Sequence, residues 1–415
     1  MAKPGLTIRI AEVLLFIFFI FALAVYPGAV PNCGVIMTAI AVMTLLTLLV
    51  TQNKLKIKRR KATNYLIVLF WLDTVANVIV DSEIVSHLFY AVQFSCIVWA
   101  IDIYCNQENR LERLIQIIFW PMFLGGPIIG TIQLFNGDYL FGSVEETNMF
   151  FTTIISDARH SNPNYTALIM VMCFCLAGYL YKKQKKMVYL LGAIYSVVCV
   201  ILTFSRTTIF VLVVGIVWLA LESLYRMGKI KRTLRGRTLV FIVLAITVII
   251  VAIPYVTQWV EEYLGQANVE KLLQIKENST IEQRLKQWKA SVQVVLENGF
   301  LHFLFGFGDE TAEILGKITY RTMTSHNLIF SSLAERGFIG FIFTLMLYGN
   351  LFFGIIRMRK KAPMDKMWIY VCSTMILICY MMVSVLTWEL YLAVILTATA
   401  MELQRNEERR LNESV

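Results

Sequence analysis

Charged side chains are scarce in this sequence of 415 residues. They make up 16% of the chain, and apolar residues make up 58%, whereas soluble domains carry roughly 25% charged and 45–50% apolar residues. Proline is also rare, at 8 positions. This composition excludes a disordered chain, collagen, a coiled coil and a secreted disulfide scaffold. One water-soluble core cannot cover so much apolar surface, so the sequence predicts a helical protein that lipid partly surrounds.

Cysteine occurs at 8 positions but never as a CxxC pair, and no histidine lies at metal-binding spacing from any of them. Nearly all of these cysteines lie in apolar segments or at their edges. We interpret them as filler in apolar helices rather than as disulfide partners or metal ligands. The sequence also has no internal repeat and no Pro-rich or low-complexity linker.

Apolar stretches of about 20 residues, which is long enough to cross a bilayer, recur along the whole chain. Their approximate ranges are 8–29, 34–51, 65–81, 87–104, 114–134, 165–181, 187–204, 207–225, 238–257, 337–356, 367–386 and 388–402. The sequence therefore predicts an all-α polytopic membrane protein with about 12 transmembrane helices.

Two long segments, 135–164 and 258–336, interrupt the pattern of spans joined by short loops. The expected organisation has three parts. Residues 1–257 hold the first nine spans, 258–336 form a large outer helical loop between the ninth and tenth spans, and 337–415 hold the last three spans and a tail.

The net charge of +10 suggests nucleic-acid binding until the positions of the charges are considered. Twelve spans place both termini on one side of the membrane, and 28 of the 38 Lys and Arg residues fall on that side. By the positive-inside rule this side is cytoplasmic, and its basic clusters act as topology signals that also attract anionic headgroups. We therefore expect no nucleic-acid partner. Lys3 and Arg9 form a weak basic region at the start of the first apolar run, and no convincing cleavage site follows that run, so we expect a retained helix rather than a signal peptide.

Functional residues are expected where polar side chains interrupt apolar segments. All four histidines and ten cations fall on the outer side of this topology. Arg206 lies in a tight outer hairpin, Thr203-Phe-Ser-Arg-Thr-Thr208, between two apolar spans. Its side chain either reaches lipid phosphates or binds an anionic substrate, and the neighbouring hydroxyl groups favour the second interpretation.

The large outer loop contains an amphipathic helix. Ser279 and Glu282 form a capping-box pattern at its start, apolar residues then recur at helical spacing, and Gly299 is a plausible C-cap. The apolar face of this helix must lie on the membrane or on the helix bundle. Arg284 lies on the helix one turn before Trp288 and by residue type alone is an ordinary solvated charge.

Two further polar clusters lie on the outer side. Arg159 precedes the sequence His160-Ser-Asn-Pro-Asn164, which suits a turn at the mouth of a span as well as it suits a site. His326 and Asn327 begin a helical run that ends at Gly337, with Glu335 close to its end. Such a histidine is often only a polar residue at a helix start, but an imidazole beside several arginines also suits a general base near an anionic lipid head.

Five motifs occur in order between about residues 150 and 400. They are Asn162-Pro-Asn164, Ser205-Arg206, Arg284 with Trp288, Gly306-Phe-Gly308, and His326-Asn327 followed by Leu333-Ala-Glu-Arg-Gly-Phe-Ile-Gly340. This set resembles the O-antigen ligase and O-antigen or capsular polysaccharide polymerase family of bacterial membrane glycosyltransferases. The N-terminal third of the chain matches that family only in hydropathy.

The resemblance implies an enzyme of the bacterial plasma membrane, with its active site on the outer face, that uses an undecaprenyl-diphosphate-linked oligosaccharide as donor. His326 is then the catalytic base, and Arg206, Arg284 and Arg159 bind the diphosphate, with Asn327 and Glu335 as further substrate-binding residues. No metal or other cofactor is expected, because no Asp-x-Asp motif stands on the outer side. The other partners implied are a glycan acceptor, the lipid bilayer, a flippase and a chain-length regulator.

The choice of acceptor stays open within the family. A polymerase of O-antigen, capsule or exopolysaccharide extends a lipid-linked repeat unit, whereas a ligase transfers the glycan to the lipid A core. We favour the polymerase, because the ligase role exists only in Gram-negative cells.

A transporter, such as a lipid-linked oligosaccharide flippase or a solute carrier, is the alternative from another class. Asp73, Asn77 and Asp102 are its few candidate residues within spans. The remaining polar residues collect at one face, which favours chemistry at the interface over transport. A purely structural scaffold would not need arginine and histidine in outer apolar hairpins.

Overall fold

The computed structural model describes residues 5–23, 31–52, 61–80, 84–105, 110–128, 131, 163–202, 205–226, 279–319, 327–359, 364–380 and 388–413. Every regular element within these ranges is a helix, which confirms the predicted all-α class. The predicted span at 238–257 and most of the loop at 135–164 lie outside the described residues.

The helices of the first half are α1 (Leu6–Leu23), α2 (Cys33–Gln52), α3 (Lys61–Val80), α4 (Ile84–Cys105), α5 (Arg110–Phe123), the π-helical turn η2 (Leu124–Ile128), α7 (Pro163–Gln184), α8 (Met187–Leu202) and α9 (Arg206–Arg226). Those of the second half are α12 (Ser279–Glu297), α13 (Phe300–Phe305), the 3-10 turn η5 (Gly308–Glu310), α14 (Thr311–Thr319), α15 (Leu328–Arg359), α16 (Met364–Tyr380) and α17 (Trp388–Glu413).

Helices α1 to α5, α7 to α9 and α15 to α17 overlap the predicted spans. Within the described ranges, 5 helices are long and apolar enough to cross a membrane: Leu6–Leu23, Cys33–Val50, Ile84–Cys105, Thr208–Tyr225 and Leu328–Met346. Shorter apolar helices accompany them, at Asn64–Val75, Met187–Leu202, Met367–Cys379 and Tyr391–Met401. The chain is thus a membrane-embedded helical protein, and the count of twelve crossings stays a prediction.

Proline lies at one helix start and at two places where a helix becomes irregular. Pro163 opens α7, a position where its missing N–H costs nothing because the first turn has no partner for that group. Pro121 lies inside α5, and Pro127 lies in the π-helical turn that follows, where a missing donor disrupts the regular ladder. Lys185 adopts a positive φ of 58° in the tight turn between α7 and α8.

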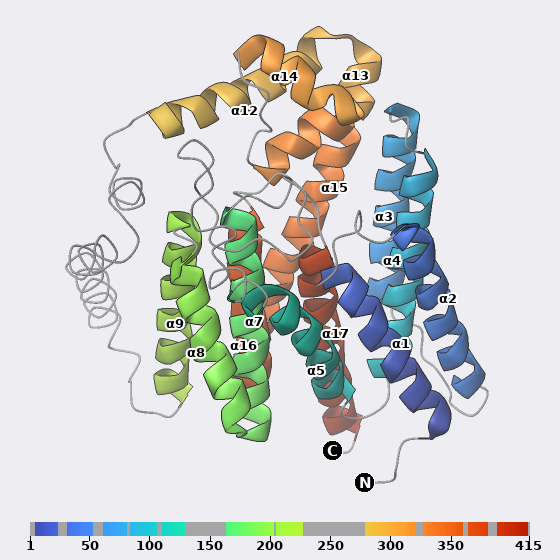
Figure 1. Ribbon diagram of the computed structural model, residues 1–415, viewed down its shortest axis with the longest axis vertical. Helices are drawn as coiled ribbons and strands as arrows, with labels where there is room; N and C mark the ends of the chain where they lie inside the picture. The colour runs from blue at the N-terminus through green and yellow to red at the C-terminus, as the bar shows by residue number, and fades with distance from the viewer. Residues whose placement is uncertain are drawn as a thin grey trace, which may run out of the picture.

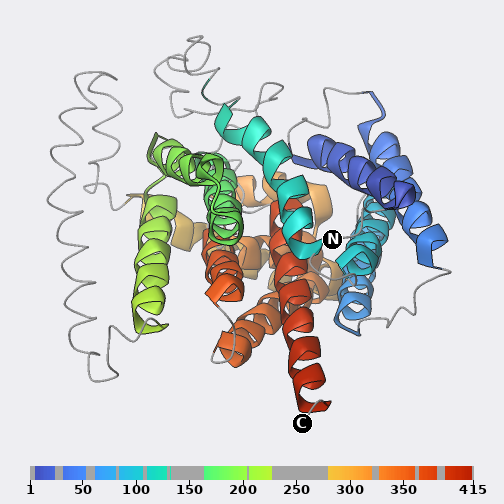
Figure 2. The ribbon, with the colours of Figure 1, turned by 90° about the horizontal axis from the view of Figure 1, so that it is seen from below.

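The long helices stand side by side with their axes roughly parallel (Figure 1). Seen from below, α1 to α4 gather on one side and α7 to α9 on the other, with α5 and the C-terminal helices between them (Figure 2). Helix α1 begins and α17 ends at the same end of the bundle, here called the terminus end (Figure 1). Helices α12, α13 and α14 lie across the opposite end (Figure 1).

Two hydrophobic cores are present in the described part of the chain. The larger one fills the bundle and includes fully buried aromatic residues such as Phe18, Phe119 and Tyr370. Large apolar side chains also face outward from the bundle, for example Val50 and Val68. Such an exposed apolar belt is expected where lipid rather than water surrounds a protein. All 8 cysteines are free, and all but Cys96 are buried, as expected for filler residues.

Candidate active site

The second, smaller core joins α12, α13 and α14 to the first turns of α15. Its buried members are Ala290, Val294, Val295, Phe307, Leu315 and Ala334. We call α12 to α14 together with residues 327–336 of α15 the cap. The apolar face of α12 therefore packs mainly on protein, although Leu285 and Leu296 remain exposed. As predicted, α12 begins at Ser279, and Gly299 follows its end with a positive φ of 90°.

Two glycines allow α13 and the break in α15 to approach each other closely. Gly306 and Gly337 have φ values of 77° and 61°, which L side chains rarely adopt. A methyl group at Gly306 would overlap the backbone of Glu335, and one at Gly337 would overlap the backbone of Leu304. The lack of side chains at Gly306 and Gly337 therefore serves close packing of two backbone segments.

Gly337 breaks α15 into two helical parts, because its φ and ψ of 61° and −158° are not helical. The predicted helical run that ends at Gly337 and the predicted span that begins at residue 337 are thus the two parts of α15 on either side of the break. The break exposes carbonyl groups that helical bonding no longer satisfies. The Ala334 carbonyl accepts hydrogen bonds from the Phe307 N–H at 3.0 Å and the Thr311 hydroxyl at 3.4 Å.

Arg336, which directly precedes the break, forms a buried ion pair. The Arg336 Nη1 donates to both carboxylate oxygens of Asp73 on α3, at 3.0 and 3.2 Å. The two side chains are only 10% and 5% exposed. Gly340 leaves room for the stem of Arg336, which a methyl group at this position would overlap. The sequence showed Asp73 within a predicted span and Arg336 in the outer loop just before another, but it gave no means of pairing residues 263 positions apart.

Asn327 caps the N-terminus of α15. Its side-chain Oδ1 accepts hydrogen bonds from the backbone N–H groups of Ile329 at 3.0 Å and Phe330 at 3.4 Å. The Asn327 side chain is buried. Its cap position gives it a structural role, in addition to the substrate contact that the resemblance implies. His326, which precedes it in the chain, lies outside the described residues.

Arg284 is held near this same end of α15. Trp288, one turn later on α12, stacks on Phe330 with ring centroids 5.1 Å apart and an angle of 13° between the planes. Phe330 lies in the first turn of α15. Arg284 is half-buried, and this burial lowers the pKa of its guanidinium. Arginine nevertheless keeps its charge near neutral pH, so α12 carries a partly desolvated cation one turn before the residue that stacks on α15.

The structure describes the remaining predicted site residues only in part. Arg206 is the first residue of α9, at the end of the bundle that faces the cap (Figure 1), and its side chain is outside the described part. Near it, the Ser205 hydroxyl donates to the Thr208 hydroxyl at 2.8 Å, and both side chains are buried. Glu335 is half-buried beside the break in α15. Arg159 lies outside the described residues.

His302 is the one histidine of the cap among the described residues. Its ring stacks on Phe307 with centroids 4.1 Å apart, and its Nδ1 lies 3.0 Å from the Gly306 carbonyl oxygen. These contacts stabilise the glycine turn. Among the described residues, no three His, Cys, Asp or Glu side chains group as a metal site. Independence from metal stays a prediction.

Comparison with known families adds one finding. Residues 191–345 match the family model described as O-antigen ligase. The matched range includes α8, α9, the cap and the start of the second part of α15, and therefore covers four of the five motifs. This match confirms the family resemblance and supports an activity of the O-antigen ligase or polymerase type. No curated protein matches the sequence.

Proposed function

Because residues 191–345 match the family model described as O-antigen ligase, we propose that this protein polymerises a bacterial surface polysaccharide. The donor is a glycan on undecaprenyl diphosphate, and the acceptor is a sugar hydroxyl of a second lipid-linked repeat unit. The observation that carries the proposal is that Arg284 is half-buried one helical turn before Trp288, whose ring stacks on Phe330 in the first turn of the helix that follows His326.

The proposed reaction is a direct displacement at the anomeric carbon. The acceptor oxygen forms a bond to that carbon while the bond from the carbon to the diphosphate oxygen breaks, which inverts the configuration. His326 takes the proton of the attacking hydroxyl. The lipid diphosphate leaves as an anion, and the guanidinium groups of Arg206 and Arg284 stabilise its growing charge, with Arg159 as a third candidate.

The environment of Arg284 suits this role. A cation exerts a stronger field on a diphosphate where neighbouring protein has displaced water. The cap supplies such a place, since α12 packs on α15 instead of projecting into solvent. Asn327 fixes the first turn of α15 by capping it, and in the proposal this fixes the backbone that carries His326. Glu335 is proposed to orient one of the charged groups.

A transporter is the weaker proposal. Its candidate Asp73 lies in an ion pair with Arg336, which occupies the carboxylate that a transport cycle would have to release. A ligase would use the same donor and the same chemistry and would differ only in its acceptor. The products of the reaction therefore distinguish a ligase from a polymerase.

The test uses cells that lack their own copy of the gene, complemented with wild type, His326→Ala or Arg284→Ala. If the protein is a polymerase, either variant should cause loss of polymer and accumulation of a single lipid-linked repeat unit. Accumulation of long lipid-linked polymer would instead identify a ligase.

Lys289→Ala provides the matched control for Arg284→Ala, because Lys289 is an exposed cation on the same helix. We expect this control to restore full polymer. Membrane levels of each variant are measured in parallel, so that lost expression is not mistaken for lost activity. Full restoration of polymer by His326→Ala would contradict the assignment of the base.

A further inference from the structure

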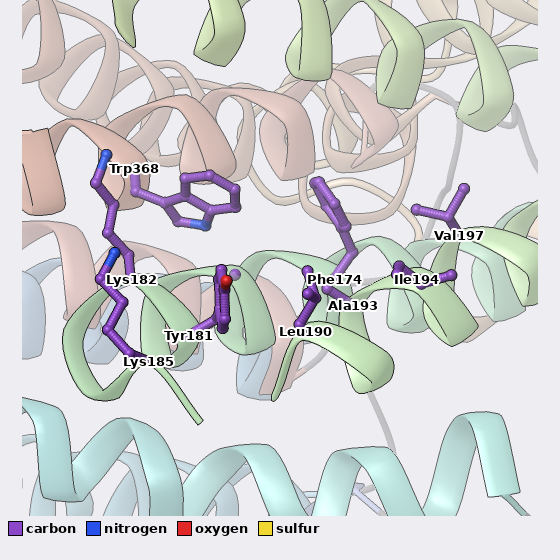
Figure 3. Close-up of a pocket in the computed structure, with 10 residues that line it drawn as sticks. Phe174, Tyr181, Lys182, Lys185, Leu190, Ala193, Ile194, Val197 and Trp368 are labelled. Atoms are coloured by element: carbon purple, nitrogen blue, oxygen red, sulfur yellow. The ribbon is translucent and has the colours of Figure 1, made fainter. Parts of the chain in front are cut away.

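A groove of about 350 Å³ runs between α7 and α8 at the terminus end of the bundle. Its wall is almost entirely apolar and includes Phe174 and Leu190. Figure 3 shows Lys182 and Lys185 together at one end of it, close to Trp368 of α16. The groove lies on the opposite side of the bundle from the cap and shares no lining residue with the candidate active site.

The groove is built by specific packing. Gly178 of α7 has no side chain, and the Trp368 ring occupies the space that a methyl group there would need. The Trp368 Nε1–H donates to the Cys175 carbonyl oxygen at 2.7 Å, which fixes the ring as one wall. Ile194 lines the opposite side and is 53% exposed, so the groove opens toward the lipid.

The cationic end is also held in place. The Gln184 side chain at the end of α7 donates to Glu112 of α5 at 2.6 Å. Lys185 follows with its positive φ, and its ammonium lies 5.6 Å from the centroid of the Tyr181 ring. Among the described residues no carboxylate forms an ion pair with Lys185. Its charge is therefore directed to the mouth of the groove and is not neutralised there.

The dimensions match one leaflet of a bilayer. From Phe174 to Lys182 the helix advances by eight residues, which corresponds to about 12 Å along its axis. Half of the hydrocarbon core of a bilayer is roughly 15 Å thick. An apolar channel of this depth with two lysines at its end has the form of a phospholipid site, with the acyl chain inside and the phosphate at the lysines.

We propose that this groove binds an anionic phospholipid of the leaflet at the terminus end. Positive charge at the mouth selects the anionic headgroup, since each cation near such a lipid surface adds to the attraction. The apolar wall between α7, α8 and Trp368 holds one acyl chain. This site is separate from the proposed glycosyl transfer, and either one stands if the other fails.

The test is a lipid titration of the full-length protein in detergent, followed by native mass spectrometry. The probes are dioleoyl phosphatidylglycerol, which is anionic, and dioleoyl phosphatidylcholine, which has the same chains and no net charge. The wild type is expected to bind one phosphatidylglycerol in preference to phosphatidylcholine. The double variant Lys182→Gln, Lys185→Gln is expected to bind it about twenty-five-fold more weakly, at roughly fivefold for each lost cation.

The turn itself offers a matched control. Lys183 and Lys186 are exposed cations of the same turn that do not line the groove. The double variant Lys183→Gln, Lys186→Gln removes the same charge and is expected to keep wild-type affinity. An equal loss in both double variants would overturn the proposal, because the attraction would then be a general effect of charge. Equal binding of the two lipids by the wild type would overturn it as well.

A second pair of variants tests the apolar wall without changing the charge. Ile194→Trp fills the groove from its open side and is expected to abolish the preference for phosphatidylglycerol. Leu191→Trp adds the same bulk on the same helix, at an exposed position outside the groove, and is expected to leave binding intact. Unaltered binding by Ile194→Trp would show that the lipid lies elsewhere.

Discussion

The buried ion pair between Arg336 and Asp73 is the contact whose removal has the most predictable consequence. It joins the break in α15 to α3 through two hydrogen bonds from one guanidinium nitrogen. Within the described residues, Asp73 is the only hydrogen-bond partner of that guanidinium. The change Asp73→Ala therefore leaves a nine-tenths buried cation without its counter-charge.

The magnitude follows from burial. Breaking a buried ion pair by removing one partner costs roughly 3–5 kcal/mol, because the remaining charge cannot recover its hydration. At about 2 °C per kcal/mol for a large domain, the unfolding midpoint should fall by roughly 6–10 °C. The exposed pair between Lys317 and Glu313 on α14, at 2.8 Å, gives the contrast. There water screens the attraction, so Glu313→Gln should leave the midpoint unchanged.

Thermal unfolding in detergent can be followed with a dye that reacts with thiols. The chain suits this assay, because its 8 cysteines are all free and nearly all buried until the bundle opens. The double variant Asp73→Leu, Arg336→Met replaces both charges with apolar groups of similar size. It should unfold close to the wild-type temperature, since neither an unpaired charge nor a large cavity remains.

Two results would refute this reasoning. If Asp73→Ala unfolds at the wild-type temperature, the ion pair does not hold α3 to the break in α15. If the double variant is as unstable as Asp73→Ala, the loss reflects packing volume rather than an unpaired charge. A stable double variant that no longer makes polymer would instead assign the pair to the geometry of the cap.

Three further changes address the cap. Gly337→Ala should destabilise the cap by about 1–3 kcal/mol through backbone strain alone, and overlap of the new methyl group with the Leu304 backbone should add to this. Limited proteolysis between α12 and α14 should therefore become faster. Trp288→Ala should cost about 0.5–1.5 kcal/mol of ring pairing beyond the lost burial and reduce polymer yield, whereas Trp288→Phe should retain most of the yield. Asn327→Ala should cost about 1 kcal/mol through the lost helix cap. Asn327→Asp keeps the oxygen that caps the helix, so this variant should restore stability. Reduced turnover by a stable Asn327→Asp variant, in an assay with lipid-linked substrate, would then show a substrate contact separate from helix capping. Loss of stability in that variant would contradict the capping role.

Composition alone determined the class of this protein. Apolar segments of membrane-spanning length, separated by basic clusters, predicted a bundle of long helices because neither feature depends on distant contacts. Local chemistry also located boundaries well. Pro163 opens α7, Ser279 opens α12, and Gly299 follows the end of α12, since capping and backbone preferences act within a few residues.

The motifs pointed to the family model that residues 191–345 match, but they gave an incomplete account of the residues in them. Asn327 belongs to a motif, yet its side chain caps a helix. Gly306 and Gly337 belong to motifs as well, and their physical role is to let two backbone segments approach each other. Sequence spacing could not reveal this contact, because it joins residues 31 positions apart through the absence of side chains.

Only the tertiary structure decided which surfaces and charges meet. An amphipathic helix suits a membrane surface and a protein surface equally, and packing against α15 settled the choice for α12. The sequence placed Asp73 within a span and Arg336 at the end of the outer loop, but their burial and pairing depend on the position of the break in α15. The groove beside Trp368 is likewise formed by three helices, two of them adjacent in sequence and one distant. Such features depend on long-range packing, which is fixed by the fit of the whole bundle rather than by any local pattern.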